Sequence, residues 1–285
     1  MIPQIGFQQP FLLHGILCLT CLHLACITPD DKERHKLDAS RYHNQAIQGF
    51  RESISEIDKG ENNDALFAWA SLNIICVFAM SGMQLHKRPS GENDALSAAQ
   101  RSQVLGAEWI PMIRGVQAVL KHVYERVRHG PLQSLTNVEN WEEIDPDQQP
   151  FECDEHFRNC KEVWAKSSDA QLYDDTLYLL RKCNAFMRQF KNMEGVILRE
   201  WSYNRIWSAP FIWLHATTEE FFLHLRQRQP PALIIFAYFG ALLHELNSYW
   251  FLEGWGLSIV KVVDEILGDY WTIWTKWPKE AIGLV

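Results

Sequence analysis

The sequence lacks the short motifs that identify most classes of enzyme. Its 285 residues contain no GxxxxGK[ST] or GxGxxG phosphate-binding loop, no HExxH metal-binding pair and no GxSxG nucleophile elbow. The aspartate-rich DDxxD motif of ionising terpene synthases is also absent, because Asp174 and Asp175 are followed by Thr176-Leu177-Tyr178. Nucleotide-dependent, zinc-protease, serine-hydrolase and diphosphate chemistry therefore have no support, and we predict no metal site and no cofactor.

The sequence also lacks an excess of positive charge. The formal net charge is −8, and a single stretch accounts for all of it. Between Gly130 and Phe157 there is no Lys or Arg, but there are eight acidic residues: Glu139, Glu142, Glu143, Asp145, Asp147, Glu152, Asp154 and Glu155. We predict an acidic loop insertion over 130–157 and, because no basic face is evident, no direct binding of nucleic acid.

Cysteines are present in an odd number, seven, and do not form a metal-binding pattern. Cys18 and Cys21 form a CxxC sequence inside the apolar run Phe11–Ala25, and no second CxxC completes a zinc site. Reduced thiols and an odd count indicate an intracellular protein. No Lys or Arg precedes Lys32, so the basic region of a signal peptide is missing. The run is marginal in length for a membrane span, and we predict none.

Helical periodicity dominates what is present, and no segment alternates convincingly as a strand does. We expect helices at 11–26, 37–57, 65–83, 109–128, 170–190, 217–227, 231–249 and 255–267. The sequence therefore predicts an all-α fold, a single domain over 1–285 of roughly eight to ten helices.

The C-terminal third is rich in large rings: eight of the twelve tryptophans lie in the last 85 residues. Residues 231–243 are apolar around the whole helix circumference, which predicts a buried helix. Within it, Gly240 and Ala241 either permit close helix approach or leave space for a ligand. The aromatic and glycine residues of Tyr249–Gly256 form either a pocket wall or an aromatic helix corner, and the sequence does not decide between the two.

Several blocks in order along the chain resemble a known family. They are Phe11-Leu-Leu-His-Gly-Ile-Leu17, Leu22-His-Leu-Ala25, Trp109–Gly115, Pro231–Leu233 with Ala237–Leu243, Trp250–Gly256 and Trp277-Pro278. Together they resemble the C-terminal regulatory domain of the sterol uptake control proteins and related fungal zinc-cluster transcription factors. The blocks extend over nearly the whole chain, and the acidic segment falls outside them.

The resemblance implies an all-helical sensing domain that binds a sterol or other isoprenoid in a hydrophobic pocket and forms a homodimer. It implies a cytoplasmic protein that is nuclear when attached to a DNA-binding region. The family's pocket region carries over onto the first helix and the Trp250–Gly256 turn. The expected ligand-binding residues are Phe11, His14, Gly15, Cys18, Phe78, Phe236, Tyr238, Phe239, Trp250, Phe251, Trp255 and Gly256.

The chain departs from the family in lacking a six-cysteine zinc cluster and a basic region. It is therefore either an excised domain or a stand-alone homologue. Cys18 and Cys21 also stand where we expect small, alanine-like residues. A stand-alone copy recruited as a cofactor-independent cyclase, pericyclase or isomerase of terpenoid or polyketide biosynthesis is the alternative, because a pocket can orient and desolvate a substrate without a motif. Its candidate catalytic groups are His14, Tyr238, His244 and Glu253. A partner-binding scaffold without a ligand, docking through the acidic segment, is a third interpretation.

Overall fold

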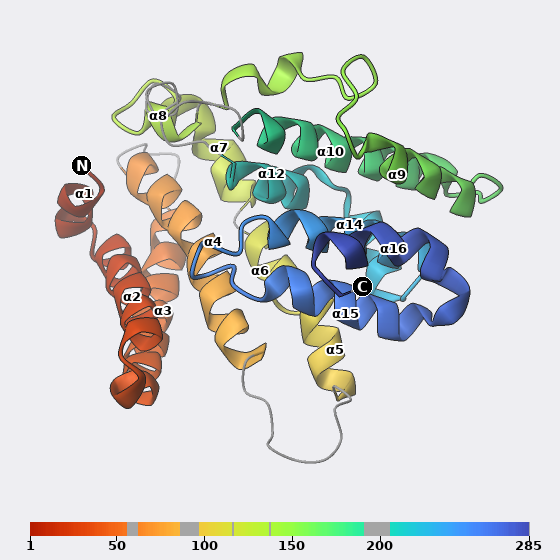
Figure 1. Ribbon diagram of the computed structural model, residues 1–285. Coiled ribbons are helices and arrows are strands. Elements are labelled where there is room, and N and C mark those ends of the chain that lie inside the picture. The colour runs from red at the N-terminus through yellow and green to blue at the C-terminus, as the bar shows by residue number, and fades with distance from the viewer. Residues whose placement is uncertain (56–61, 86–96, 116, 137, 191–205, 285) are drawn as a thin grey trace. The chain divides into compact units, whose positions relative to one another are not determined.

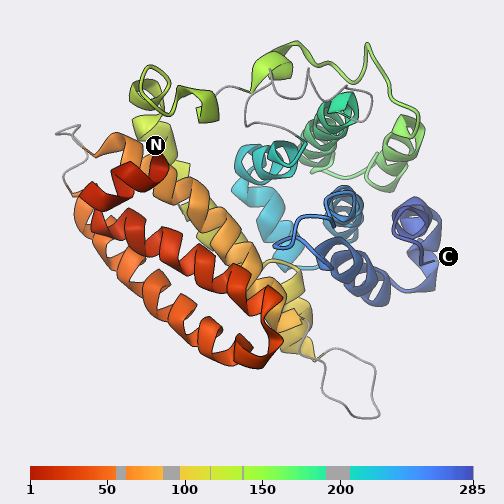
Figure 2. The ribbon, with the colours of Figure 1, turned by 60° about the vertical axis from the view of Figure 1, so that its left-hand side comes forward.

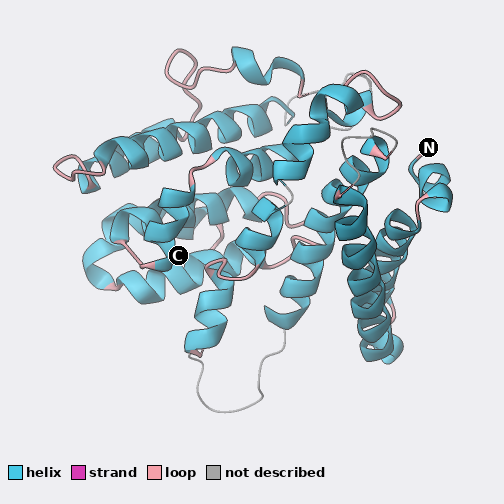
Figure 3. Ribbon diagram, turned by 180° about the vertical axis from the view of Figure 1, so that it is seen from behind, coloured by secondary structure: helices cyan, strands magenta, loops and turns pink. Residues whose placement is uncertain are grey.

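A computed structural model describes residues 1–55, 62–85, 97–115, 117–136, 138–190 and 206–284. These residues form α-helices and short 3-10 helices joined by turns, and no strand occurs among them (Figures 1 and 3). The prediction of an all-α fold is confirmed.

The contacts within the chain divide it into two compact units. Unit 1 comprises Met1–Gln84 and Pro111–Asn137, and unit 2 comprises Leu85–Ile110 and Val138–Val285. Helix α6 (Trp109–Gly115) carries the chain from one unit to the other. The single domain expected over 1–285 stays a prediction.

Unit 1 is built on three long helices, α2, α3 and α4, which lie side by side (Figure 2). It contains α1 (Ile2–Gln8), α2 (Pro10–Ile27), η1 (Pro29–Asp31), α3 (Lys32–Ile54), α4 (Asn63–Leu85), α7 (Gln117–Val127) and α8 (Gln133–Thr136). Its apolar core includes Phe11, Leu12, Phe50, Leu66, Trp69, Val123, Val127 and Leu132.

Two glycines permit the close packing of the unit 1 helices. A Cβ added to Gly15 of α2 would lie 2.4 Å from the Trp69 ring, and one added to Gly49 of α3 would lie 2.8 Å from the Cβ of Phe11. Glycine weakens a helix by about 1 kcal/mol relative to alanine. Here it allows aromatic side chains of the neighbouring helices to contact the backbone directly.

Unit 2 surrounds one buried helix, α14 (Pro230–His244). Its other elements are α5 (Ala98–Val104), η3 (Glu139–Glu143), α9 (Asp154–Asn159), η4 (Cys160–Val163), α10 (Ala170–Gln189), α12 (Ser208–Ala216), α13 (Glu219–Arg226), α15 (Trp255–Leu267), η6 (Asp269–Trp271) and α16 (Thr272–Ala281). All residues from Ala232 to Leu243 are buried, and α14 packs against α10, α12, α13, α15 and α16. This confirms the prediction from its uniformly apolar sequence.

The crossing of α14 and α15 depends on a pair of glycines. A Cβ on Gly256 would lie 2.5 Å from both the Gly240 carbonyl oxygen and the His244 nitrogen, and a Cβ on Gly240 would lie 2.8 Å from Ile259. Of the two roles considered for Gly240, the structure therefore shows close helix approach. Gly254 directly precedes α15 (Trp255–Leu267) and has a φ of 75°, a left-handed conformation that residues with a side chain disfavour.

The sequence predicts fewer helices than the structure contains. The described residues hold more than the predicted eight to ten, because short helices such as α1, α5 and α12 contain too few turns to show a periodic pattern. The helix expected at 109–128 is observed as α6 and α7.

The acidic segment differs from the expected loop. It includes α8, η3 and the start of α9, and Leu132, Asp154 and Phe157 are buried within it. Most of its described acidic side chains are exposed, but Asp154 is buried, so part of the segment packs into unit 2.

Two helices of the described residues, α2 and α4, are long and apolar enough to cross a membrane by length and composition. In the most apolar 18-residue stretch of each helix, 33% is buried in α2 and 67% is buried in α4. The expectation of no membrane span stays a prediction.

Candidate functional site

The predicted site residues of unit 1 lie on α2 and α4, and most of them face inward. Phe11, Cys18 and Phe78 are buried, as is Gly15 against Trp69. The exception is His14, which is half-buried and stacks on Tyr42 of α3 with 6.1 Å between ring centroids. His14 is thus the polar group beside the partly uncovered side of α2.

The predicted site residues of unit 2 contribute to an aromatic core. Phe239 stacks on Trp213 at 4.5 Å and lies 5.5 Å from Phe236. The ring of Trp109 lies 5.3 Å from Trp255, edge to face. Edge-to-face and offset contacts of this kind add about 0.5–1.5 kcal/mol per pair beyond the burial of apolar area.

The turn before α15 holds the remaining predicted residues. Phe251 is buried, Trp250 is half-buried and lies 5.8 Å from Phe251 edge to face, and Gly256 contacts the backbone of α14. The side-chain oxygen of Asn247 accepts a 2.7 Å hydrogen bond from the Gly254 backbone nitrogen and closes the turn. The predicted set is divided between the two units, and its role in ligand binding stays a prediction.

Among the candidate catalytic groups, Tyr238 has the most defined surroundings. Its hydroxyl donates a 3.0 Å hydrogen bond to the His156 carbonyl oxygen. Burial, with Cys160 beside it, raises the pKa of the Tyr238 hydroxyl far above its ordinary value, so this group is a hydrogen-bond donor and not a base. His244 is half-buried with Nδ1 lacking a hydrogen-bond partner, and Glu253 is exposed on the turn before α15.

Each unit holds a cavity that is lined by described residues. In unit 1 a cavity of about 430 Å³ is lined by Met1, Gln4, Ile5, Gln8, Gln9, Asn62, Asp64, Ala65 and Pro131. In unit 2 a groove of about 280 Å³ is lined by His156, Asn159, Glu162, Tyr238, Ile273, Trp274, Lys276, Trp277 and Glu280. Of the predicted site residues, Tyr238 lines one of these two cavities.

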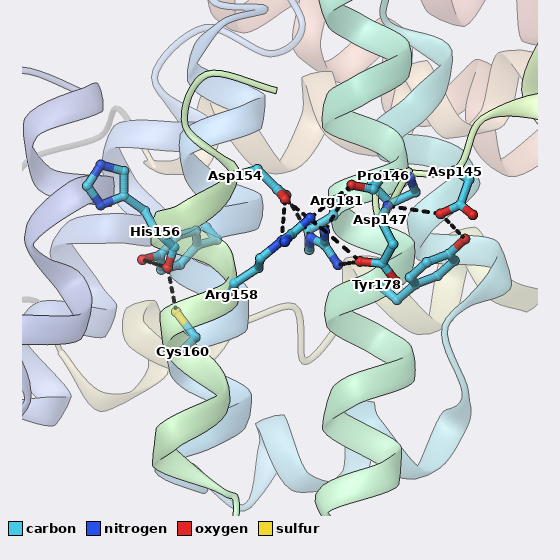
Figure 4. A network of polar contacts seen from close by, with 10 residues as sticks. Asp145, Pro146, Asp147, Asp154, His156, Arg158, Cys160, Tyr178 and Arg181 are labelled. Atoms are coloured by element: carbon cyan, nitrogen blue, oxygen red, sulfur yellow. Dashed lines mark hydrogen bonds and ion pairs between the residues drawn. The ribbon is translucent and has the colours of Figure 1, made fainter. Parts of the chain in front are cut away.

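Sequence reasoning missed a buried charge network in unit 2 that holds the acidic segment (Figure 4). Arg181 of α10 is 1% exposed and donates to both carboxylate oxygens of Asp154, at 2.7 and 2.8 Å. It also donates to Asp147 at 2.7 Å and to the Pro146 carbonyl oxygen at 3.1 Å. Arg158 donates a second 2.7 Å bond to Asp154.

These contacts determine the electrostatics of the network. Hydrogen bonding from Arg181 holds the pKa of Asp147 below its ordinary value. Burial acts to lower the pKa of Arg181, but the hydrogen bonds that its guanidinium donates to Asp154 and Asp147 outweigh this effect, and the pKa of Arg181 is raised. The sequence did contain a signal for this network. Arg181 interrupts the buried face of α10 formed by Leu177, Leu180 and Asn184, and a buried arginine needs a charged partner.

The cysteines and candidate metal ligands form no centre in the described part of the chain. None of the seven cysteines, all of which lie in the described ranges, takes part in a disulfide, and Cys18, Cys76, Cys160 and Cys183 are buried. Burial raises the pKa of Cys160 to about 12. Within the described ranges, no three His, Cys, Asp or Glu side chains are placed to hold a metal ion.

Comparison with known proteins finds similarity to fungal transcription regulators. Residues 1–135 match the profile of the fungal specific transcription factor domain. The chain is similar to a Zn(2)-C6 fungal-type transcription factor of Gibberella zeae, with 22% identity over 97% of this chain and 54% of the relative. It is also similar to Sterol uptake control protein 2 of Saccharomyces cerevisiae, with 26% identity over 94% of this chain and 27% of the relative.

The chain spans about half the length of the first relative and about a quarter of the second. No solved structure matches it significantly.

Proposed function

From the premise that this chain is a distant homologue of the fungal zinc-cluster transcription factors, we propose that it is the sensing domain of a transcription regulator and binds a hydrophobic polycyclic ligand, a sterol or other isoprenoid. The observation that carries the proposal is the similarity to Sterol uptake control protein 2, which extends over 94% of this chain. As part of such a regulator the domain is intracellular, and nuclear when joined to a DNA-binding region.

The composition of α2 supports an apolar ligand. This helix has a mean hydropathy of 1.9 over its 18 residues, yet only a third of this stretch is buried. Leu13, Leu17 and Leu24 remain half-buried on it. Covering such apolar surface contributes roughly 25 cal/mol per Å² removed from water. Several kcal/mol are therefore available to a sterol-sized ligand on this helix.

His14 supplies the polar group that such a ligand needs. A sterol carries a single hydroxyl on an apolar ring system, and binding sites for such molecules combine apolar walls with a few placed hydrogen-bonding groups. The imidazole of His14 is half-buried beside Leu13 and Leu17 and is held by stacking on Tyr42. We assign the ligand hydroxyl to His14.

The test is a titration of the purified chain with a fluorescent sterol, read by energy transfer from tryptophan, with native mass spectrometry to identify what is bound. We expect saturable binding of one sterol per chain. Replacing His14 by Phe should weaken binding by a factor of about 2 to 13, which corresponds to the loss of one hydrogen bond worth about 0.5–1.5 kcal/mol.

The matched control is His23→Phe. His23 lies on the same helix nine residues away, is exposed, and points to the opposite side, so this variant should leave the affinity unchanged. Absence of sterol binding would refute the proposal. Release of the ligand with an altered mass would instead support the enzyme alternative.

A further inference from the structure

The groove of unit 2, here called the α16 groove, is not used by the proposed sensing function. It is lined by α9, η4, α14 and α16 through the nine residues given above, and its volume is about 280 Å³. Pockets for drug-sized ligands range over roughly 300–1,000 Å³. The α16 groove lies just below that range, and it has room for one amino-acid side chain.

One wall of the α16 groove is a rigid aromatic stack. The ring of Trp277 stacks on Tyr238 at 5.2 Å and on His156 at 6.0 Å, with interplanar angles of 20° and 21°. Phe157 lies 5.0 Å from the same ring. Because each of these rings already packs against another, ordering them around a ligand costs little conformational entropy.

The charges of the groove favour a cation. Its lining includes the carboxylates of Glu162 and Glu280 and the ammonium of Lys276. Lys276 Nζ lies 3.7 Å from Glu280 Oε1, so these two charges offset each other and Glu162 gives the groove a net negative charge. The faces of tryptophan rings also attract cations, and arginine most often.

An exposed apolar patch continues from the groove along η6 and α16. Tyr270 is 79% exposed and Ile273 is 73% exposed, and the half-buried rings of Trp271 and Trp274 lie 5.4 Å apart. Exposed apolar side chains grouped on one element mark interaction surfaces, and Trp and Tyr are enriched in them. The groove and the patch together favour an occupant larger than a free cation.

We propose that the α16 groove docks a basic, partly apolar peptide segment of a partner protein. One arginine side chain of that segment occupies the groove beside Trp274, with its guanidinium paired to Glu162, and a neighbouring apolar side chain covers Ile273.

The experiment uses the full chain labelled with 5-fluorotryptophan, and ¹⁹F NMR reads each tryptophan separately. The Trp274 signal is identified as the one lost in Trp274→Phe. The probes are N-acetyl-arginine methylamide and its leucine and glutamate counterparts. We expect only the arginine derivative to shift the Trp274 signal saturably. No shift, or an equal shift with the leucine derivative, would overturn the proposal.

Variants test the two contacts separately. Glu162→Gln should weaken binding of the arginine derivative about two- to fivefold, the range for an exposed ion pair. Glu220→Gln, an exposed glutamate of α13 outside the groove, is the matched control and should have no effect. An affinity unchanged by Glu162→Gln contradicts the pairing.

A second arm tests whether the occupant is a peptide. An octapeptide with one arginine among leucines should bind more tightly than the arginine derivative. Because Ile273 lines the groove and is also exposed beyond it, Ile273→Ser should reduce the affinity of the peptide by a larger factor than that of the small probe. Equal affinities of peptide and small probe would show that the site takes a free cation and would overturn the docking proposal.

Discussion

Replacement of Arg181 by Met tests how the acidic segment is held in unit 2. The substitution removes four charge-assisted hydrogen bonds, two to Asp154, one to Asp147 and one to the Pro146 carbonyl oxygen. The carboxylate of Asp154, which is 2% exposed, then stays buried without this partner. Removing one partner of a buried ion pair costs about 3–5 kcal/mol, mainly because the other charge remains buried. Asp154 keeps its 2.7 Å bond from Arg158, so we expect the lower end, about 3 kcal/mol.

The size of the effect should depend on burial. Asp147 is 61% exposed, so Asp147→Asn should cost less than about 1 kcal/mol although it contacts the same guanidinium. Asp154→Asn combined with Arg181→Met should cost less than the sum of the single changes, because the unpaired buried charge is removed.

The assay is urea unfolding followed by circular dichroism, with hydrogen exchange of residues 138–159 as a local reading. Exchange in this segment should accelerate in Arg181→Met while α14 stays protected. A loss below about 1 kcal/mol, or unchanged exchange of the segment, would refute the argument that the buried pair holds it.

Three further predictions follow from packing and burial. Gly256→Ala should destabilise unit 2 by about 3 kcal/mol, because its Cβ would lie 2.5 Å from the α14 backbone; Gly115→Ala, where no atom lies within 4 Å, is the control and should cost nothing in urea unfolding. Burial lowers the pKa of His43 in the folded chain. As the pH falls below about 6.5, the unfolded chain therefore binds a proton at His43 more readily than the folded chain does. The free energy of unfolding should be highest above about pH 6.5 and decrease below it. His43→Gln should reduce this fall in unfolding midpoint between pH 7.5 and 5.5, and an unchanged pH dependence would count against it. Iodoacetamide should label exposed Cys26 in the native chain but reach Cys18, Cys76, Cys160 and Cys183 only after unfolding, as mass spectrometry of the peptides would show.

Part of the architecture follows directly from local sequence. Helices α2, α3, α4, α10, α14 and α15 are long, and their apolar residues repeat with the period of a helix or cover the whole circumference. The burial of α14 is predictable for the same reason, because no face of it carries charge. Short helices such as α12 and α16 were missed, since one to three turns give no clear period.

The candidate sites depend on contacts between distant parts of the chain. The aromatic residues 236, 239 and 255 are recognisable as interior positions, but that Trp213 and Trp109 complete their cluster is a matter of tertiary packing. The α16 groove joins residues of α9 with residues more than a hundred positions later, and no local pattern indicates this.

The sequence by itself determined the helical class, the buried identity of α14 and the resemblance to fungal regulators, because these depend on residue order over short windows. Only the tertiary structure decided the roles of particular side chains. It showed that Gly240 and Gly256 permit two helices to meet, and that the acidic segment is anchored by Arg181. The physical reason is that close contact and charge pairing depend on distances in space, which separation along the chain does not specify.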